Sequence, residues 1–403
     1  MAEAGKKKIV LTGGGTAGHV TPNIALLPAL REAGYEVAYV GSENGIEREL
    51  MRDCGIPYIG VPTGKLRRYF DLKNFTDPFR VIKGYSKARQ FLKSYRPDVV
   101  FSKGGFVSVP VVRAAASLKI PCVIHESDMT PGLANKLCYG AASKVCCNFP
   151  ETVDKLPKGK AVLTGTPIRA ELFTGDREEG LRICGFAQEN ENAASADLKT
   201  VNPEASNAES PDAKPVTSEK PVLMIMGGSQ GAQSVNEAVR RHLDELLQDF
   251  RVVHLCGAGK YDASKDGIEG YKQFEYVKED LKHLFAAADI IVSRAGANAI
   301  FEILALQKPN LLIPLSIGTR GDQILNARSF EAQGFSKVLV ESEEDGILDK
   351  KLVDTVRTLY AERESYTAAM AGAGQQAAIP TIMGLLNELA EGKQSSENKK
   401  KHK

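Results

Sequence analysis

The sequence predicts an α/β fold: two doubly wound, Rossmann-like parallel sheets, one in each of two domains, that face each other across a cleft. Three observations lead to this fold class. The chain has 403 residues, more than one hydrophobic core usually supports, so two domains are expected. Short apolar runs alternate with amphipathic stretches, and this rhythm restarts near residue 220. Each half of the chain also opens with a strand-like run that leads directly into a glycine cluster.

The individual apolar runs have the length of buried strands and precede helices or loops, which is typical of βα repetition. In the first half we expect strands at residues 8–11, 36–40, 98–101, 121–125, 144–147 and 160–163. In the second half we expect them at residues 221–226, 251–256, 274–277, 289–293, 310–314 and 337–340. We therefore expect an N-terminal domain over residues 1–166 and a C-terminal domain over residues 167–370.

Three further segments lie outside the two expected sheets. Residues 187–220 carry almost no large apolar side chain and are rich in Ala, Asn, Glu, Ser and Pro, so we expect a disordered insertion. Residues 371–390 are expected to form helices that cross back and brace the N-terminal domain. Residues 391–403 end in a run of lysines, and we expect a basic, flexible tail.

Composition excludes several classes of protein. The chain is 43% hydrophobic and 25% charged with a net charge of +2, so it has no overall positive field of the kind that collects nucleic acid. No apolar run is long enough to span a bilayer, and the charged start lacks the apolar region of a signal peptide, so a cytosolic protein is expected. The 7 cysteines contain no C-x-x-C pair, which favours reduced thiols over disulfides or a zinc site.

Two glycine turns, one in each half, are candidate phosphate sites. Residues 8–11 lead into Thr-Gly-Gly-Gly-Thr-Ala-Gly-His at 12–19, and residues 222–226 lead into Gly-Gly-Ser-Gln-Gly-Ala at 227–232. Glycines let the backbone approach a ligand, and the helix that follows presents free N–H groups to an anion. A phosphate-free turn or a nicotinamide or flavin site remains an alternative for the first, although Glu43 lies beyond the expected position of a ribose-binding acid.

Two more glycine clusters follow strands. Gly104 and Gly105 follow the expected strand 98–101 after Ser102 and Lys103, so the first domain presents two glycine turns at adjacent strand ends. In the second domain Ser-Arg-Ala-Gly-Ala-Asn at 293–298 precedes a helix that carries Glu302. A carboxylate at that position can accept hydrogen bonds from both hydroxyls of a ribose; the alternative is an acid placed to interact with the helix dipole.

The identity and order of the motifs are more specific evidence of a family than the spacing of the glycines. The chain contains, in this order, TGGGTAGH at 12–19, GTPIR at 165–169, GGSQGA at 227–232, SRAGA at 293–297 with Glu302, and RGDQILNA at 320–327. Together they closely resemble the MurG-type N-acetylglucosaminyltransferases, from about Lys8 to about Leu389. The resemblance implies a GT-B fold, no cofactor, and UDP-N-acetylglucosamine as donor. It also implies inverting transfer to the C4 hydroxyl of undecaprenyl-pyrophosphoryl-MurNAc-pentapeptide in peptidoglycan synthesis.

The same resemblance implies roles for individual residues. Donor-binding positions are Thr16, Ala17, Gly18, Arg169, Gly228, Ser229, Gln230, Val277, Ala297, Asn298, Glu302, Asp322 and Gln323. Acceptor-binding positions are Gly14, Gly15, Gly104, Gly105 and Asp128. The chain departs from the family pattern in two places: Ser127 and Asp128 stand where many relatives carry Gln and Asn, and Asp322 replaces an amide. An ionised acid can only accept hydrogen bonds from sugar hydroxyls.

Transfer from a nucleotide sugar requires charge compensation for the leaving pyrophosphate and a base for the acceptor hydroxyl. The chain contains no Asp-x-Asp, so we expect metal-independent chemistry in which helix N-termini, Arg169 and the Ser229 hydroxyl compensate the charge. His19 closes the first glycine loop at a helix start, where the dipole disfavours its charged form and suits it to act as the base. Glu126 is the other candidate base. The alternatives are that His19 only braces the loop or contacts a phosphate, and that Glu126 is an ordinary acid at the rim of the site.

A lipid acceptor would require the first domain to meet a membrane surface. We expect a helix from Asp77 as N-cap and Pro78 at N1 to about Ser94, with a core face formed by Val81, Tyr85, Ala88 and Leu92. The opposite face interleaves apolar and basic residues and, with two arginines upstream, forms a candidate membrane patch: Arg67, Arg68, Phe79, Arg80, Ile82, Lys83 and Lys87. A solvated helix face is the alternative.

The resulting expectation is a peripheral enzyme at the cytoplasmic face of the bacterial plasma membrane. Its partners would be the donor, the lipid acceptor and anionic lipid, with proteins of cell-wall synthesis or division as further candidates. Two other possibilities share the fold: a UDP-N-acetylglucosamine 2-epimerase and a transferase with another acceptor. A nicotinamide oxidoreductase and a nucleotide-sugar-binding sensor belong to other classes.

Overall fold

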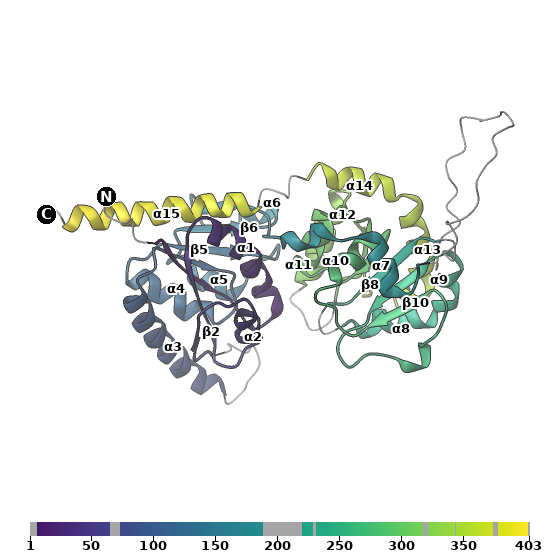
Figure 1. Ribbon diagram of the computed structural model, residues 1–403, viewed down its shortest axis with the longest axis horizontal. Coiled ribbons are helices and arrows are strands. Elements are labelled where there is room, and N and C mark those ends of the chain that lie inside the picture. The colour runs from purple at the N-terminus through teal and green to yellow at the C-terminus, as the bar shows by residue number, and fades with distance from the viewer. Residues whose placement is uncertain are drawn as a thin grey trace, which may run out of the picture.

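The computed structural model describes residues 6–64, 73–187, 220–228, 231–316, 321–342, 344–373 and 378–401, with side chains left out at 73–78 and 396–401. Figure 1 shows two lobes side by side, each with a sheet enclosed by helices. The expected insertion at 187–220 lies almost entirely outside the described residues, as do Arg67 and Arg68. Among the described residues, no helix combines the length and the apolar character needed to cross a membrane.

Each lobe is built on one parallel sheet. The sheet of the first lobe has the order β3-β2-β1-β4-β5-β6-β7, and that of the second lobe has the order β10-β9-β8-β11-β12-β13. The first seven strands are β1 (Lys8–Thr12), β2 (Glu36–Ser42), β3 (Tyr58–Val61), β4 (Val99–Ser102), β5 (Cys122–Glu126), β6 (Lys144–Cys147) and β7 (Ala161–Leu163). The others are β8 (Val222–Met226), β9 (Arg251–Leu255), β10 (Tyr271–Phe274), β11 (Ile290–Ser293), β12 (Asn310–Leu312) and β13 (Lys337–Val338). The predicted fold class, two doubly wound parallel sheets, is confirmed.

Helices connect the strands and cover both faces of each sheet. The first lobe contains η1 (Ala17–His19), α1 (Thr21–Glu32), α2 (Ile46–Asp53), α3 (Lys73–Tyr95), α4 (Ser108–Ser117), α5 (Leu133–Cys138) and α6 (Pro150–Val153). The second contains η2 (Ala170–Thr174), α7 (Arg177–Cys184), α8 (Gln233–Arg241), α9 (Leu243–Asp249), η4 (Ala263–Lys265), α10 (Leu281–Ala287), α11 (Ala297–Ala305), α12 (Asp322–Ala332), α13 (Ile347–Ala361) and α14 (Arg363–Ala371). The last helix, α15 (Ala378–Lys401), returns to the first lobe.

Alternate residues of each strand enter different cores, which explains why the inner strands read as continuous apolar runs. In β1, Val10 joins a cluster with α3 and α4, whereas Ile9 and Leu11 join a cluster with α1 and α15. In β8, Leu223 and Ile225 face α8, α9 and α13, whereas Val222, Met224 and Met226 face α7 and α10.

The structure differs from the sequence-based expectations at several elements. β3 was not predicted, and β10 occupies 271–274 and not 274–277. Helix α3 begins at Lys73, so Asp77 is not its N-cap and Pro78 is not its first residue. Residues 391–401, where a basic tail was expected, continue helix α15.

Helix α15 packs along the first lobe (Figure 1). Ile382 and Leu386 are fully buried against residues of α1, including Leu26. Polar contacts reinforce this packing, because the Tyr35 hydroxyl donates to Asn387 Oδ1 at 2.9 Å and Lys7 Nζ lies 3.0 Å from Glu391 Oε1. The C-terminal segment of the chain is therefore part of the first lobe.

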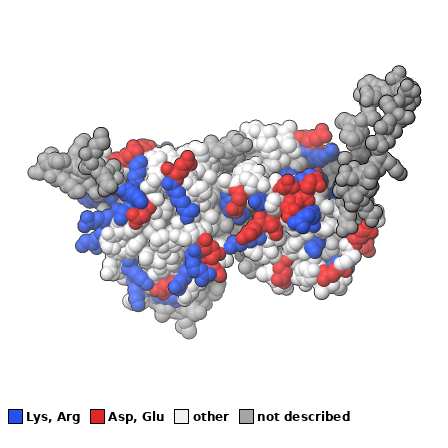
Figure 2. Space-filling view, viewed as in Figure 1, with Lys and Arg blue, Asp and Glu red and all other residues white. Residues whose placement is uncertain are grey.

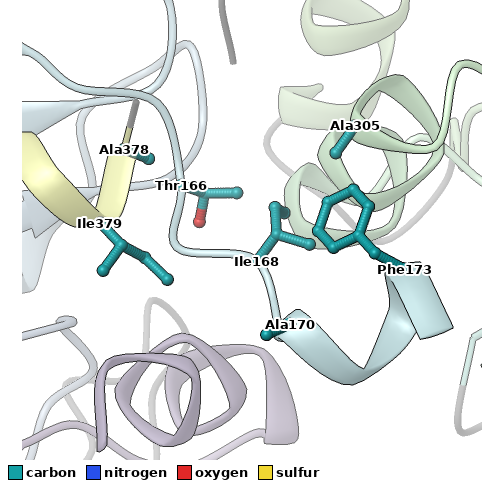
Figure 3. A pocket seen from close by; sticks show the side chains of 7 residues that line it. All are labelled: Thr166, Ile168, Ala170, Phe173, Ala305, Ala378 and Ile379. Atoms are coloured by element: carbon teal, nitrogen blue, oxygen red, sulfur yellow. The ribbon is translucent and has the colours of Figure 1, made fainter. Parts of the chain in front are cut away.

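The lobes meet at a linker and an aromatic cluster. The linker follows β7 and runs through Thr166 and Ile168; Figure 3 shows it passing the start of α15 and leading into η2, where it borders an apolar cavity of about 350 Å³. Phe149 follows β6, yet its ring packs against Phe301 at 5.2 Å and Phe330 at 6.0 Å between centroids, both in the second lobe. Because Phe149 is almost fully buried, the two lobes share a hydrophobic cluster.

Candidate active site

A cavity of about 840 Å³ opens at the carboxyl ends of the strands in the first sheet. Ligands of doubly wound sheets bind at this edge, where neighbouring strands connect in opposite directions. Its walls include seven predicted catalytic or acceptor-site residues: Gly14, Gly15, His19, Gly104, Gly105, Glu126 and Asp128. Two predicted donor-site residues, Thr16 of the first lobe and Asp322 of the second, also line it. The structure therefore brings both predicted bases and all five predicted acceptor positions into one cavity.

The two glycine turns of the first lobe touch each other, which explains their composition. Gly15 has φ +90° and Gly105 has φ +83°, values that favour glycine. A Cβ atom on Gly105 would overlap the carbonyl oxygen of Gly14. Any other residue at position 105 would push the two turns apart and change the floor of the cavity.

A buried acid that the sequence did not predict supports the first glycine turn. The Glu47 carboxylate accepts hydrogen bonds from Ser42 N at 2.9 Å, Ser42 Oγ at 2.5 Å and Gly15 N at 3.4 Å. Glu47 is fully buried at the start of α2. In the sequence, only its position as an acid in the first helical turn after β2 could have indicated this role. A nicotinamide-binding protein carries its ribose-binding acid close to this position, but here donors of the protein itself bond to the Glu47 carboxylate.

His19 ends η1 and is partly buried beside the second glycine turn. Burial, and secondly the charge of Lys103, lower the pKa of its imidazole to about 4. His19 is therefore neutral at pH 7, in agreement with the expectation. The main cause is burial, however, whereas the expectation relied on the helix dipole.

Glu126 ends β5 and is almost completely buried. Its Oε2 accepts hydrogen bonds from Gly132 N at 2.9 Å and Asn135 Nδ2 at 3.0 Å. Burial raises the pKa of the carboxyl to about 7, although these two bonds and the charge of Lys103 favour the ionised form. A carboxyl with this pKa can exchange a proton near neutral pH.

Behind Glu126 lies a pair that no prediction assigned to the site. His125 Nε2 lies 2.8 Å from Gly165 O, and His125 Nδ1 lies 2.7 Å from Lys103 Nζ. Both side chains are buried, and burial lowers the pKa of Lys103 to about 7 and that of His125 well below its usual value. His125 thus has a structural role, because it connects Lys103 to the backbone of Gly165. The only signal for Lys103 was its position between a strand and a glycine pair.

On the donor side the structure pairs two predicted residues. Arg169 Nη2 lies 3.5 Å from Glu302 Oε1, and Arg169 Nη1 lies 3.0 Å from Glu171 Oε1. Burial raises the pKa of Glu302, and Arg169 opposes that shift. Arg169 comes from the interlobe linker and Glu302 from the second turn of α11, so the linker helps to form the donor side.

Other predicted donor residues lie in the first turn of α11 and in the segments that follow β8 and β10. Asn298, in the first turn of α11 beside Ala297, donates from Nδ2 to Gly18 O at 2.7 Å across the lobe boundary. Gly228 has φ +80° in the turn after β8, while Ser229 and Gln230 lie outside the described residues. Val277 follows β10 and packs against the core of the second lobe.

Helix α12 carries the pair expected to read the sugar. Asp322 begins this helix and faces the 840 Å³ cavity, whereas Gln323 Oε1 accepts from Leu315 N at 3.0 Å. One turn later Asn326 joins the lobes: its Nδ2 donates to Asp128 Oδ1 at 3.1 Å and its Oδ1 accepts from Met129 N at 3.0 Å. Asp128 therefore contacts the second lobe as well as the cavity. Across the described ranges, no three His, Cys, Asp or Glu side chains gather into a metal site.

Helix α3 buries the face that the helical wheel predicts to be its core face, and its opposite face exposes both apolar and basic side chains. Phe79 and Ile82 are 74% and 62% exposed, and Arg80, Lys83 and Lys87 are exposed beside them. Ala88 and Leu92 are fully buried, with Val81 and Tyr85 partly buried. Lys87 Nζ lies 3.2 Å from Glu43 Oε1. Figure 2 shows Lys and Arg gathered at the outer edge of the first lobe, whereas both signs of charge alternate over the second.

Comparison with known proteins gives a family and close relatives. Residues 9–147 match the glycosyltransferase family 28 N-terminal domain, and residues 222–384 match the C-terminal domain of that family. Two similar curated proteins are both UDP-N-acetylglucosamine--N-acetylmuramyl-(pentapeptide) pyrophosphoryl-undecaprenol N-acetylglucosamine transferases. The one from Lachnoclostridium phytofermentans is 56% identical, covering 95% of this chain and 99% of the relative. The one from Clostridium tetani is 50% identical, covering 95% and 98%.

Solved structures agree on the fold. MurG from Acinetobacter baumannii has a TM-score of 0.67 at 23% identity, covering 95% of this chain and 99% of that one. The glycosyltransferase SnogD from Streptomyces nogalater has a TM-score of 0.58 at 16% identity, covering 95% and 99%. At these identities the likeness concerns the GT-B fold alone.

Proposed function

The chain belongs to glycosyltransferase family 28, and from that premise we propose that it transfers N-acetylglucosamine from UDP-N-acetylglucosamine to N-acetylmuramyl-(pentapeptide) pyrophosphoryl-undecaprenol. The observation that carries the proposal is the 840 Å³ cavity, in which two glycine turns and Glu126 of the first lobe face Asp322 of the second. Such a cavity can hold an acceptor on one lobe while the sugar of the donor approaches from the other. The 2-epimerase and sensor alternatives are not favoured, because full-length relatives at 50–56% identity are transferases.

The base in this mechanism is Glu126. It takes the proton from the acceptor C4 hydroxyl as that oxygen bonds to the anomeric carbon, and the bond from this carbon to the UDP oxygen breaks with inversion. A base acts best when its pKa lies near the working pH. The pKa of Glu126 is about 7, whereas that of His19 is about 4, so His19 is the weaker base of the two. His19 remains well placed to accept a hydrogen bond from the acceptor.

Arg169 and Glu302 bind the donor. In this contact the charges of Arg169 and Glu302 partly neutralise each other. With a nucleotide bound, Glu302 accepts hydrogen bonds from the ribose hydroxyls, and Arg169 turns to the diphosphate, where its charge stabilises the leaving UDP. The helix N-termini after β8 and β11 add partial positive charge at the same edge of the sheet.

This account predicts that transfer does not require a divalent ion. The chain has no Asp-x-Asp, and the groups named above compensate the charge of the leaving UDP. We expect turnover to be unchanged in excess EDTA when UDP release is followed by a coupled assay whose coupling enzymes need no metal. Loss of activity in EDTA that magnesium restores would contradict this assignment of leaving-group stabilisation.

The function itself is tested by the acceptor requirement. We expect UDP to be released only when a polyprenyl-pyrophosphoryl MurNAc-pentapeptide is present, together with a disaccharide product. A 2-epimerase would convert the sugar nucleotide without any acceptor, and a transferase of another specificity would ignore the lipid-linked sugar. Either result would overturn the proposal.

The acceptor also places the enzyme at a membrane. We propose that it binds peripherally at the cytoplasmic face of the bacterial plasma membrane through Phe79, Arg80, Ile82, Lys83 and Lys87. Their exposure on one face of α3 supports this role. Proteins of cell-wall synthesis or division remain candidate partners.

A further inference from the structure

Lys103 is a buried lysine at the base of the cavity to which the proposed mechanism assigns no step. It follows β4, and 1% of its surface is exposed. Its Nζ lies 2.7 Å from His125 Nδ1, 2.7 Å from Ser127 Oγ and 3.5 Å from Thr166 Oγ1. Thr166 belongs to the interlobe linker (Figure 3). One side chain thus connects the second glycine turn, the loop after β5 and the linker.

The hydrogen bonds around Lys103 suit a protonated amine. His125 Nε2 lies 2.8 Å from a carbonyl oxygen and therefore carries the hydrogen, which leaves Nδ1 as an acceptor. An ammonium group has three donors and no acceptor, and each of its three neighbours offers a lone pair. Within the described part of the chain, no carboxylate forms an ion pair with Lys103. Neutral acceptors hold this buried amine, and burial lowers its pKa to about 7, so below that pH it is mainly protonated and its charge acts on the cavity.

Titratable groups face Lys103 from several elements. Glu126 and Asp128 come from β5 and the loop after it, Cys146 comes from β6 and His19 from η1, in addition to His125. Burial has the largest effect on the pKa of Glu126 and of His19, raising the first and lowering the second. Lys103 lowers both pKa values, so its charge favours the forms that accept a proton.

We propose that Lys103 is a positioning residue for glycosyl transfer, whose ammonium group holds residues 125–127 against the linker and places a positive charge behind Glu126. The inference rests on the proposed function, since Glu126 must act as the base for the charge to matter. Lys103 acts through its neighbours, because only 1% of its own surface is exposed. It sets the orientation of His125 and Ser127 and the proton affinity of the cavity.

The test compares Lys103→Met, which keeps the length of the side chain and removes its charge, with wild type and with Lys158→Met, which removes an exposed lysine of the same lobe. We expect kcat of Lys103→Met to fall by roughly 10²-fold, as displacement of a catalytic group by about 1 Å can do. The acid limb of its pH–rate profile should move to higher pH, because Glu126 loses the cation that favours its ionised form. UDP affinity should stay at the wild-type value in both variants.

A second variant covers the case in which Lys103→Met does not fold. Ser127→Ala removes one acceptor of the ammonium and keeps the charge, so kcat should fall while the acid limb stays near its wild-type position. An unchanged acid limb in a folded Lys103→Met, or a wild-type kcat in Ser127→Ala, would overturn the inference.

A spectroscopic readout separates this inference from the proposed function. In ¹⁵N-histidine spectra, His125 of wild type should show a protonated Nε2 and a hydrogen-bonded, unprotonated Nδ1, and the Nδ1 signal should shift in Lys103→Met but not in Lys158→Met. If wild type fails to glycosylate the lipid acceptor, the proposed function is wrong whatever this signal does. If wild type transfers the sugar and the Nδ1 signal is the same in both variants, the role of Lys103 is wrong.

Discussion

Burial is the main cause of the pKa shifts of Glu126 and His19, two side chains in the cavity, yet it shifts the two pKa values in opposite directions. Burial disfavours charge, so it raises the pKa of an acid and lowers the pKa of an imidazole. Glu126 thereby approaches pH 7 and His19 moves away from it, to about 4. The same physical effect makes the carboxylate a stronger base and the imidazole a weaker one.

Replacing each candidate base should separate their roles. We expect Glu126→Gln to lower kcat by about 10²- to 10⁴-fold, the usual contribution of a general base, with donor KM nearly unchanged. His19→Asn keeps a hydrogen-bonding group at that position and should cause a smaller loss. Steady-state kinetics at saturating donor measures both.

The pH profile of the wild-type enzyme gives an independent check on the base. Activity should rise with pH as Glu126 loses its proton, with a midpoint near 7 in kcat/KM for the acceptor. A base with the pKa of His19 would place the midpoint near 4. An acid limb centred near 4 would assign proton removal to His19.

Sequence reasoning singled out the glycine turns, Glu126 and Glu302 because each lies at the end of a strand, or in the turn or helix that follows it, at the edge of the sheet where ligands bind. It missed Glu47 and Lys103 because their roles depend on neighbours that are distant in the chain: Gly15 for Glu47, and Thr166 for Lys103. Periodicity can show that such residues lie near a strand end. It cannot show which partner a buried charged group finds.

At the scale of elements, the inner strands and the edge strands β7 and β13 were predicted, whereas the edge strands β3 and β10 were not. β3 and β10 are edge strands, and each is only partly covered. In β10 the exposed Lys272 separates the buried Tyr271 and Gln273, so the apolar run at 274–277 was mistaken for the strand. Alternation on a half-covered strand gives a weaker signal than a run buried on both faces.

Helix α3 offers an element-scale test of membrane binding. Replacing Arg80, Lys83 and Lys87 with Gln should weaken binding to anionic vesicles by about 1 kcal/mol per charge, and added salt should have the same effect. Replacing Phe79 and Ile82 with Ser should weaken binding without unfolding the protein, because Ala88 and Leu92 still fill the core face. Vesicle sedimentation measures the binding, and circular dichroism the fold.

A matched control removes three lysines from the second lobe: Lys272, Lys350 and Lys351, all exposed, are changed to Gln. This variant has the same net charge as the α3 variant and should bind vesicles like wild type. Turnover of a short-chain, water-soluble acceptor should be normal in all of these variants. Equal loss of vesicle binding in the control would mean that overall charge, and not the face of α3, directs the enzyme to the membrane.

For the whole molecule, the arrangement of the lobes is part of the site. Asn298 and Asn326 of the second lobe bond to Gly18, Asp128 and Met129 of the first, and all five residues lie in or beside the predicted motifs. The two predicted domains were visible in the repeated βα rhythm. The contacts between them were not, because they join single side chains to backbone groups or side chains of loops, and no periodic pattern encodes the relative position of those loops.

Phe149 links the two lobes through packing, and its removal should affect both stability and catalysis. Phe149→Ala deletes a ring that is buried between the lobes, which should lower the free energy of unfolding by about 3–5 kcal/mol. Phe285→Ala is the matched control, because it deletes a fully buried ring within the second lobe. Both variants should be destabilised to a similar extent in urea.

Only Phe149→Ala should speed hydrogen exchange at the Met129 amide, whose acceptor is Asn326 of the other lobe. It should also lower kcat/KM for the acceptor while UDP affinity is maintained, since Arg169 and Glu302 keep their place. Unchanged exchange at Met129 in a destabilised Phe149→Ala would show that the polar contacts alone hold the lobes in register.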